Sequence, residues 1–339
     1  MIDLLTIRPQ LYEREYVPRI KGSLVAADRI TLQVPKMAVN IGSVILPLAA
    51  QEVVLSNAAA WDTTAGTNYT VAANRAGVNF YLYATANGLL LSANATVPSG
   101  YTAETSKQVG GFHCLCLSVG TISGHPLSGF LTGDIIPASV WDLTHRPACS
   151  PAGMVYSELA DIWVDIYLQS GTGAATRSAF GGTITDTRDW NDFTDDLAAV
   201  GKRMLSDPEF QIAAAGGNEK NNIAGSADPV SAGGHTDTAG RRMISNIGCE
   251  DMAGAMWQWL LDQSYRNDDA SYSGAWGWQT LGGNKGSIYR QGGTGDVKLL
   301  AGGSWNIGTA CGSRCRYAYY YRWVTYSAFG SRGCARRQG

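Results

Sequence analysis

The chain has 339 residues, enough for two domains or for one large domain with long loops. Its formal net charge is −2 and its pI about 6.1, so no basic field points to a nucleic-acid partner. Only 16% of the residues are charged and 41 are glycines, which favours a loop-rich protein whose surface is partly covered in an assembly.

The N-terminal segment, residues 1–45, lacks the pattern of a secretory signal. Asp3, Glu13 and Glu15 interrupt it, and it has no apolar run followed by a cleavage site of small residues. No stretch of the chain approaches the roughly 20 apolar residues that a membrane helix needs. We therefore expect a protein made in the cytoplasm without a signal peptide and without membrane insertion, and we interpret residues 1–45 as a docking segment.

The next region, residues 46–138, is predicted to be rich in β-structure. Residues 41–118 contain few charges and many short apolar stretches punctuated by Gly, Asn and Pro. In 78–93, VNFYLYATANGLLLSA, two such runs flank Asn87-Gly88, a combination typical of a hairpin turn. The weak charge of this region suits burial between subunits.

Residues 139–339 differ in character, since nine of the ten tryptophans lie here. The run 163–170, WVDIYLQS, alternates apolar and polar residues and predicts a strand. A helix is expected at about 191–201, and a second one should begin at Ser206, where Pro208 suits the first turn and Glu209 completes a capping box. A long loop over 216–240 and short strands follow, so the expected fold class is α+β.

Cysteine and acidic residues give little support for a metal centre. The seven cysteines are odd in number and irregularly spaced, so we expect reduced, mostly buried thiols, and Cys114-Leu-Cys116 has the wrong spacing for a zinc knuckle. Asp161 with Asp165, and the run Asn267-Asp-Asp269, are weak candidates for a cation site. No cofactor is predicted, and the metal content stays open.

Four segments resemble the formylglycine-generating-enzyme branch of the C-type lectin fold, in the order of that family. Their residues are 201–215 (GKRMLSDPEFQIAAA), 245–259 (SNIGCEDMAGAMWQW), 299–305 (LLAGGSW) and 329–333 (FGSRG). The resemblance implies a C-type lectin-like domain over residues 139–339, in which Trp257 and Trp259 serve in packing.

A second resemblance is more specific. Residues 302–334, GGSWNIGTACGSRCRYAYYYRWVTYSAFGSRGC, look like the variable region of proteins diversified by diversity-generating retroelements, and residues 107–113, 141–148 and 163–168 look like further segments of that family. Its members include receptor-binding proteins at the tips of phage tail fibres. The resemblance implies a homotrimer, with 46–138 as the trimerisation or fibre-like domain, and a ligand-binding face made by the last strands and loops.

The local pattern agrees with such a face. Five of the sixteen tyrosines lie between residues 317 and 329, and tyrosine offers a large, rigid contact at low entropic cost. Cys315, Tyr317 and Tyr319 would share one face of a strand, because residues two apart point the same way. In the family that the chain resembles, error-prone reverse transcription of template adenines turns Asn codons into codons for many residue types, and this makes the corresponding positions variable. The resemblance implies this variable, ligand-binding set: Ser304, Asn306, Ile307, Ala310, Cys315, Tyr317, Tyr319, Tyr320, Val324, Tyr326 and Ala328.

The residues between the variable positions are expected to form a constant scaffold. The resemblance assigns this role to Gly302, Gly303, Trp305, Cys311, Gly312, Ser313, Arg314 and Arg316. Tyr321 and Trp323 are ambiguous between the two sets. An alternative for the tyrosines is that they are ordinary core or trimer contacts.

These features favour a non-enzymatic protein that binds a receptor on a target-cell surface, located in a phage virion or encoded by a prophage. A tail-fibre docking partner would hold its N-terminal segment. The main alternative is a formylglycine-generating-type oxidase that uses Cys311 and Cys315, although their C-x3-C spacing differs from the C-x4-C of those enzymes. A third alternative is a cellular surface protein with the same variable face.

Overall fold

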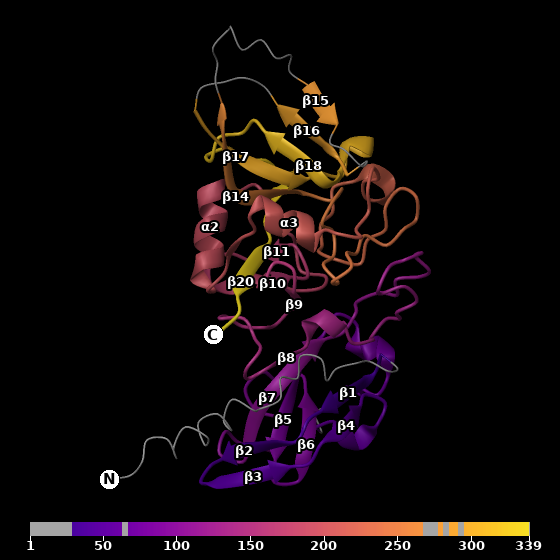
Figure 1. Cartoon of the computed structure of the whole chain (residues 1–339), viewed down its shortest axis with the longest axis vertical. Coiled ribbons are helices and arrows are strands. Elements are labelled where there is room, and N and C mark those ends of the chain that lie inside the picture. The colour runs from indigo at the N-terminus through magenta and orange to yellow at the C-terminus, as the bar shows by residue number, and fades with distance from the viewer. Residues whose placement is uncertain (1–28, 63–66, 267–276, 281–284, 291–294, 339) are drawn as a thin grey trace, which may run out of the picture. The chain divides into compact units, whose positions relative to one another are not determined.

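The computed structural model describes residues 29–62, 67–266, 277–280, 285–290 and 295–338. The chain divides into two compact units (Figure 1). Unit 1 runs to Leu115 and also takes in Thr132–Arg146 and the last two residues, whereas unit 2 consists of Cys116–Leu131 and Pro147–Arg337. Of the expected docking segment 1–45, the part before residue 29 lies outside the described residues.

Unit 1 is built from antiparallel strands. A four-stranded sheet has the order β6-β5-β7-β8, and two further strand pairs are β1–β4 and β2–β3. The pairing of β1 with β4 joins residues on both sides of the expected domain limit at 45/46. The strands are β1 Thr31–Val34, β2 Met37–Ile41, β3 Val44–Leu48, β4 Gln51–Val54, β5 Asn79–Thr85, β6 Gly88–Ser92, β7 Ser106–His113 and β8 Trp141–Asp142; short 3-10 turns are η1 Ala58–Ala60, η2 Ala72–Arg75 and η3 Pro137–Ser139.

The predicted hairpin in this unit is the β5–β6 connection. Thr85 pairs with Gly88, so the two connecting residues are Ala86 and Asn87, one position earlier than expected. Along β5 and β7 the buried residues are mainly aromatic and aliphatic. The Phe80 ring packs edge-on against the Trp61 ring, with the two ring centroids 4.8 Å apart. This aromatic core explains why the weakly charged half of the sequence folds as a β-unit.

Unit 2 contains two main sheets. A four-stranded antiparallel sheet has the order β13-β20-β10-β9, and a six-stranded mixed sheet has the order β15-β16-β18-β17-β14-β19. The strands are β9 Met154–Ser157, β10 Ile162–Asp165, β11 Gln169–Ser170, β12 Arg177–Ser178, β13 Arg203–Met204, β14 Trp257–Arg266, β15 Gly277–Thr280, β16 Ser287–Arg290, β17 Gly295–Gly302, β18 Gly312–Ala318, β19 Phe329–Gly330 and β20 Gly333–Arg336; 3-10 turns are η4 Gly173–Ala175, η5 Ala224–Ser226 and η7 Gly308–Ala310.

Two helices, α2 Trp190–Ala199 and α3 Asp207–Ala213, were predicted correctly because their caps are local. The Asp189 carboxylate accepts a hydrogen bond from the Asp192 N–H at 2.9 Å and so begins α2. The Glu209 carboxylate accepts the Ser206 N–H at 2.8 Å at the start of α3, as the capping box requires. Arg203 also donates to Glu209, and although burial raises the pKa of that carboxyl, these hydrogen bonds lower it to about 2.

Strands nevertheless predominate over helices, so the expected α+β class is corrected to a mostly β chain with few helices. The stretches after residue 256, expected as short strands between large loops, include the longer paired strands β14 and β17. Within the described ranges no helix combines the length and the apolar character needed to cross a membrane.

The C-terminal strand β20 is preceded by a fully buried arginine. β20 lies between β10 and β13, pairing with both. Just before it, the Arg332 side chain is 1% exposed and donates to Gln258 Oε1 at 3.0 Å and to the carbonyl of Asp165 at 2.7 Å. It also donates to the carbonyls of Ile166 and Glu250. A fully buried guanidinium is stable only with such a complete set of acceptors.

Candidate binding face

The predicted binding segment lies on β18 and on the connection from β18 to β19. Figure 1 shows β18 within the six-stranded sheet, where it pairs with β17 on one side and with β16 on the other. Tyr317 pairs with Leu300 of β17 and with Tyr289 of β16. The first part of the segment, β18, is therefore fixed at the centre of the sheet, and the connection after Ala318 continues outside the sheet.

The connection 319–328 has little regular structure, and its backbone is held by main-chain hydrogen bonds. These bonds do not depend on which side chains the connection carries, since every residue except proline has the same backbone groups. They come from neighbouring parts of unit 2: Lys298 N–H to Tyr320 O (3.1 Å), Trp190 N–H to Arg322 O (2.9 Å), Thr187 N–H to Tyr326 O (3.2 Å) and Trp257 N–H to Ala328 O (2.9 Å).

The aromatic residues of this region form one continuous cluster. Tyr317 is at its centre, stacked on Tyr289 with ring centroids 5.0 Å apart and on Tyr320 at 5.1 Å. Tyr317 also meets Trp257 edge-on at 5.3 Å, and Tyr320 meets Phe329 at 5.1 Å. Burial, together with the neighbouring tyrosines, raises the pKa of Tyr317. Such ring pairs stabilise a fold by more than the burial of their area alone, so the cluster both forms part of the surface and stabilises the strands beneath it.

Most of the predicted variable residues lie at the surface of unit 2. Among the eleven, the exposed side chains are Asn306 and Tyr326, and the partly buried ones are Ile307, Ala310, Tyr317, Tyr319, Tyr320, Val324 and Ala328. Tyr326 is 55% exposed, and the ambiguous residue Trp323 is 62% exposed and stacks on Tyr321 at 4.8 Å. Several of them pack on the buried cluster formed by Phe193, Leu197, Met204, Trp257, Trp259, Leu300, Cys315 and Phe329.

Ser304 and Cys315 are the exceptions, because neither lies at the surface. Ser304 is 1% exposed, and its hydroxyl hydrogen-bonds with the side-chain oxygen of Asn306 at 2.9 Å. Cys315 is fully buried in the cluster beneath the tyrosines. Their expected place on the ligand-contacting surface is therefore corrected: these two side chains lie under the face, where they can affect only its shape.

The expected scaffold glycines are required by close backbone approaches. Gly302 has φ +88°, and a Cβ there would lie 2.5 Å from the carbonyl oxygen of Met252. Gly303 has φ +89°, and a Cβ there would lie 2.8 Å from that of Cys311. Both the left-handed conformation and the lack of space exclude other residues.

Arg316 and Ser313 connect the face to the rest of unit 2. Arg316 is 3% exposed and donates to Asp207 Oδ1 at the start of α3, while its guanidinium lies 5.0 Å from the ring of Phe210. The Ser313 N–H donates to Glu219 Oε2 at 3.0 Å, close to the buried backbone of Gly312. Arg316 and Ser313 thus have hydrogen-bond partners in distant parts of unit 2, as residues of a constant scaffold should. The backbone carbonyl of Trp305 likewise accepts a hydrogen bond from the Asn222 side chain.

Arg314 does not fit the scaffold set as well. Its side chain is exposed, and its backbone N–H, rather than its guanidinium, connects β18 to the carbonyl of Lys285. The alternation of β18 explains the difference, because Arg314 lies on the opposite face of the strand from Cys315.

The two cysteines of the oxidase alternative are buried thiols in a poor environment for chemistry. Burial raises the pKa of Cys311 to about 12, and burial also raises the pKa of Cys315. Reactive and metal-binding cysteines need the opposite shift, since the thiolate is the nucleophile and the ligand. The geometry therefore does not favour a cysteine-pair oxidase.

The weak cation candidates also have other partners or cannot be assessed. Lys202 Nζ donates to Asp165 Oδ1 at 2.6 Å, and the Tyr156 hydroxyl donates to Asp161. The run 267–269 lies outside the described residues. In the described part of the chain, three or more His, Cys, Asp or Glu side chains are nowhere grouped as a metal site.

Sequence reasoning missed two aromatic residues of the cluster, Trp278 on β15 and Tyr289 on β16. Trp278 lies parallel to Trp257 at 6.1 Å and edge-on to Tyr289 at 5.3 Å. The only signal in the sequence was their aromatic character, because the parallel pairing of β16 with β18 joins segments that no local pattern connects.

Comparison with known proteins agrees with this architecture. Residues 26–142 match the family model described as "Mtd second domain". The "Tail fiber receptor-binding protein" of Bordetella phage BPP-1 is 27% identical, over 93% of this chain and 84% of that protein. Among solved structures, the P3c variant of the Major Tropism Determinant has a TM-score of 0.70 at 24% identity and the M1 variant 0.69 at 24%; each match covers 93% of this chain and 83% of the other. The chain is thus similar to the Major Tropism Determinant: residues 26–142 match the model of its second domain, and the fold is shared over 93% of the chain.

Proposed function

We propose that the chain is the receptor-binding protein of a phage tail fibre, located on the virion, and that it attaches the phage to a receptor on the host-cell surface. It acts by binding and not as an enzyme. Support comes from the Bordetella phage relative, which is by name a tail fiber receptor-binding protein. The burial of Cys311 and Cys315, which raises the pKa of both thiols, agrees with a binding role.

One structural observation carries the proposal. The connection 319–328 is held by backbone hydrogen bonds, while its side chains Trp323 and Tyr326 are exposed. A loop held in this way can exchange its side chains and keep its path, which is what a face needs in order to bind unrelated targets. The proposed face consists of the nine surface members of the expected variable set, and a retroelement would diversify their codons. The assignment of unit 2 to the formylglycine-generating-enzyme-like branch of the C-type lectin fold is part of the same proposal.

The test of this function is competition for host cells. Purified full-length protein should block adsorption of the phage that carries its gene, and the change of Tyr326 and Val324 to alanine should abolish the block while the protein stays folded at the temperature of the assay. The exposed Leu159, which is 86% exposed in unit 2, serves as the control when changed to alanine. The proposal is refuted if the altered protein competes as well as the original.

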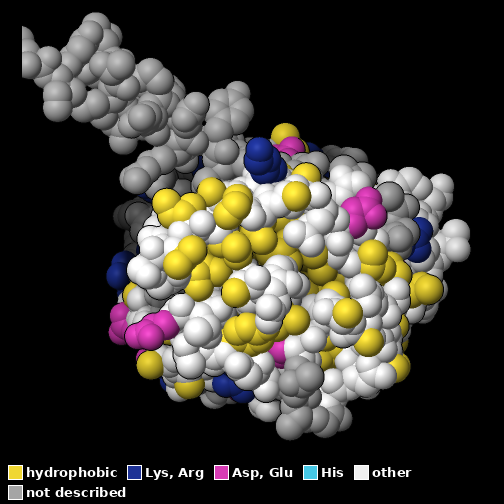
Figure 2. All heavy atoms as spheres, turned by 90° about the horizontal axis from the view of Figure 1, so that it is seen from below, with side chains coloured by type: hydrophobic (Ala, Val, Ile, Leu, Met, Phe, Trp, Pro, Cys, Tyr) yellow, Lys and Arg dark blue, Asp and Glu magenta, His cyan; other side chains and the backbone are white. Residues whose placement is uncertain are grey.

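The proposal includes a homotrimer formed through unit 1. β3 is apolar but faces solvent along most of its length, with Val44 63% and Ile45 71% exposed. Figure 2 views the chain from the end where β3 lies in Figure 1, and apolar side chains gather across that face with the charges mainly at its edge. Contiguous apolar surface of this kind marks an interface.

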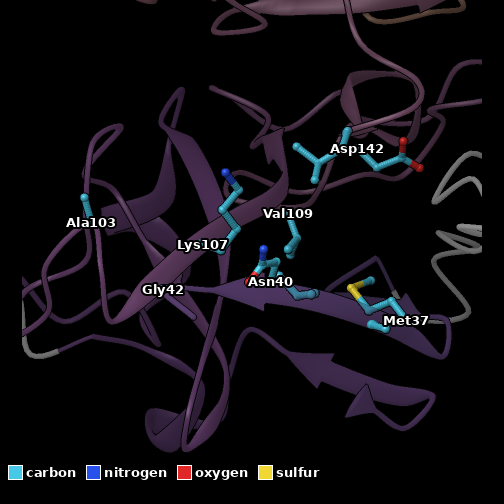
Figure 3. A pocket seen from close by; sticks show the side chains of 10 residues that line it. Met37, Asn40, Gly42, Ala103, Lys107, Val109 and Asp142 are labelled. Atoms are coloured by element: carbon cyan, nitrogen blue, oxygen red, sulfur yellow. The ribbon is translucent and has the colours of Figure 1, made fainter. Parts of the chain in front are cut away.

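A hollow in the same unit adds support for the trimer. It has a volume of about 370 Å³ and lies between β2 and β7 (Figure 3). Met37 and Val109 are apolar residues of its lining, which also includes Asn40, Lys107 and Asp142. An aliphatic side chain of a neighbouring copy would fit there. The rest of residues 1–45, before Val44, would then dock the trimer to the fibre, and several trimers on one virion would gain avidity of about 10²–10⁴-fold.

Ile45→Asp is expected to dissociate the trimer, because it places a charge in the proposed apolar interface. Light scattering coupled to gel filtration should give about the 36.1 kDa mass of one chain in place of three times that mass. Leu159→Asp makes the same replacement on an exposed apolar residue of unit 2 and should leave the mass unchanged. A wild-type protein that runs as a monomer would contradict the trimer.

A further inference from the structure

The strand pair β15–β16 lies before residue 302, outside the segment that resembles the variable region, and yet it is joined to that segment. β16 pairs in parallel with β18, with Tyr289 opposite Tyr317, and β15 pairs with the other edge of β16. A Cβ on Gly286 would lie 2.4 Å from the backbone nitrogen of Cys315, so the two backbones are in direct contact. The position of β16 against the face therefore depends on backbone contacts.

The side chains of this pair continue the aromatic cluster. The Tyr289 ring stacks on Tyr317 with an interplanar angle of 6°. The Trp278 ring contacts three members of the cluster, lying 6.1 Å from Trp257, 5.3 Å from Tyr289 and 6.2 Å from Tyr317. The cluster thus extends from the expected variable residues to residues whose codons precede them.

Exposure separates the two parallel indoles. Trp257 is 4% exposed and belongs to the core, whereas Trp278 is 38% exposed at the outer side of the stack. A tryptophan that is held by neighbouring rings and still open to solvent is a typical anchor of a protein interface, because it is already ordered before binding.

We propose that Trp278, supported by Tyr289, is a constant contact of the binding face: it touches the protein receptor in every variant, while the nine surface members of the variable set supply the specificity. This inference rests on the proposed function. It assigns affinity to an encoded anchor and selectivity to the diversified residues, so that a newly diversified face would begin with some binding energy.

The experiment uses two sequence variants of the full chain that differ at Val324 and Tyr326 and that bind intact cells of different host strains. Trp278→Ala in each variant should weaken binding of the labelled protein to its own host cells about tenfold, in line with the loss of an interface tryptophan. Protease treatment of the cells should abolish binding of the parent proteins, since the receptor is proposed to be a protein. Binding that survives protease would overturn that part of the inference.

The controls separate an anchor from a support and from a failure of the function itself. Trp278→Phe should retain part of the affinity, and Leu159→Ala should retain all of it. The melting temperature of Trp278→Ala should stay close to that of the parent; a large fall would assign Trp278 to stability and overturn the proposal. An unchanged affinity, or a loss in one variant only, would also overturn it. If neither parent binds cells, the proposed function fails as well.

Discussion

Replacement of Arg332 by alanine is expected to lower the free energy of unfolding by about 3–5 kcal/mol, the largest effect of any single substitution considered in this chain. The guanidinium is 1% exposed and donates to four acceptors, among them Gln258 Oε1 and the carbonyl of Asp165. Alanine would remove all of these bonds and leave a cavity and unpaired polar groups. It would also remove the positive charge that lies near the buried carboxylates of Asp165, Glu250 and Asp251.

Equilibrium unfolding in guanidinium chloride, followed by tryptophan fluorescence, measures this effect. Arg332→Lys keeps the charge but not the planar set of donors, so an intermediate loss is expected. Arg336→Ala is the matched control, because Arg336 lies four residues further on and is exposed; its change should stay within about 0.5 kcal/mol. Equal unfolding curves for Arg332→Ala and the parent would show that the buried network does not contribute to stability.

Replacement of Tyr317 by alanine is expected to lower the free energy of unfolding by about 2–4 kcal/mol, less than for a fully buried ring because Tyr317 is half-buried. The ring is in contact with Trp257, Tyr289 and Tyr320, so its loss opens the centre of the cluster. Tyr317→Phe preserves these contacts and should change stability by about 1 kcal/mol or less.

Thermal and chemical unfolding of both variants give the comparison. Tyr326→Ala is the control, because that tyrosine is 55% exposed and should cost less than about 1 kcal/mol. If Tyr317→Ala were as stable as Tyr326→Ala, the centre of the cluster would be a surface feature without structural weight. If the prediction is confirmed, position 317 accepts mainly aromatic residues, even though its codon is among those expected to vary.

Local signals were enough to predict the helices and the hairpin. Both caps of the helices lie within three residues of the carboxylates that complete them, as at Ser206 and Glu209, so no distant contact was needed. The turn near Asn87 was found for the same reason, although Gly88 belongs to the strand and not to the turn. The α+β class is not confirmed, because the chain after residue 256, expected as short strands between large loops, contains strands as long as β14 and β17, and the chain is mostly β with few helices.

The residues of the binding face were predicted in part, but how deeply each of them is buried could not be predicted. Period-two alternation correctly put Cys315 and Tyr317 on one side of β18, since both contact the same buried cluster. That alternation carries no information on how far other strands cover each residue, and Cys315 is enclosed by Gly286 and Gly303, both distant in sequence. Trp278 was missed for a related reason. It lies near Tyr317 because β15 pairs with β16, and β16 pairs in parallel with β18, a strand distant in sequence.

The burial of Ser304 and Cys315 sets a limit on the yield of diversification. A random substitution at the exposed Tyr326 changes mainly the surface offered to a receptor, but one at Cys315 must fit a closed space, where an added methylene costs about 1–3 kcal/mol. Under the proposed diversification, part of the variant proteins would therefore be less stable, whatever hosts are present. The useful repertoire is then smaller than the number of codon combinations, because substitutions at the two buried positions are limited by the space around them.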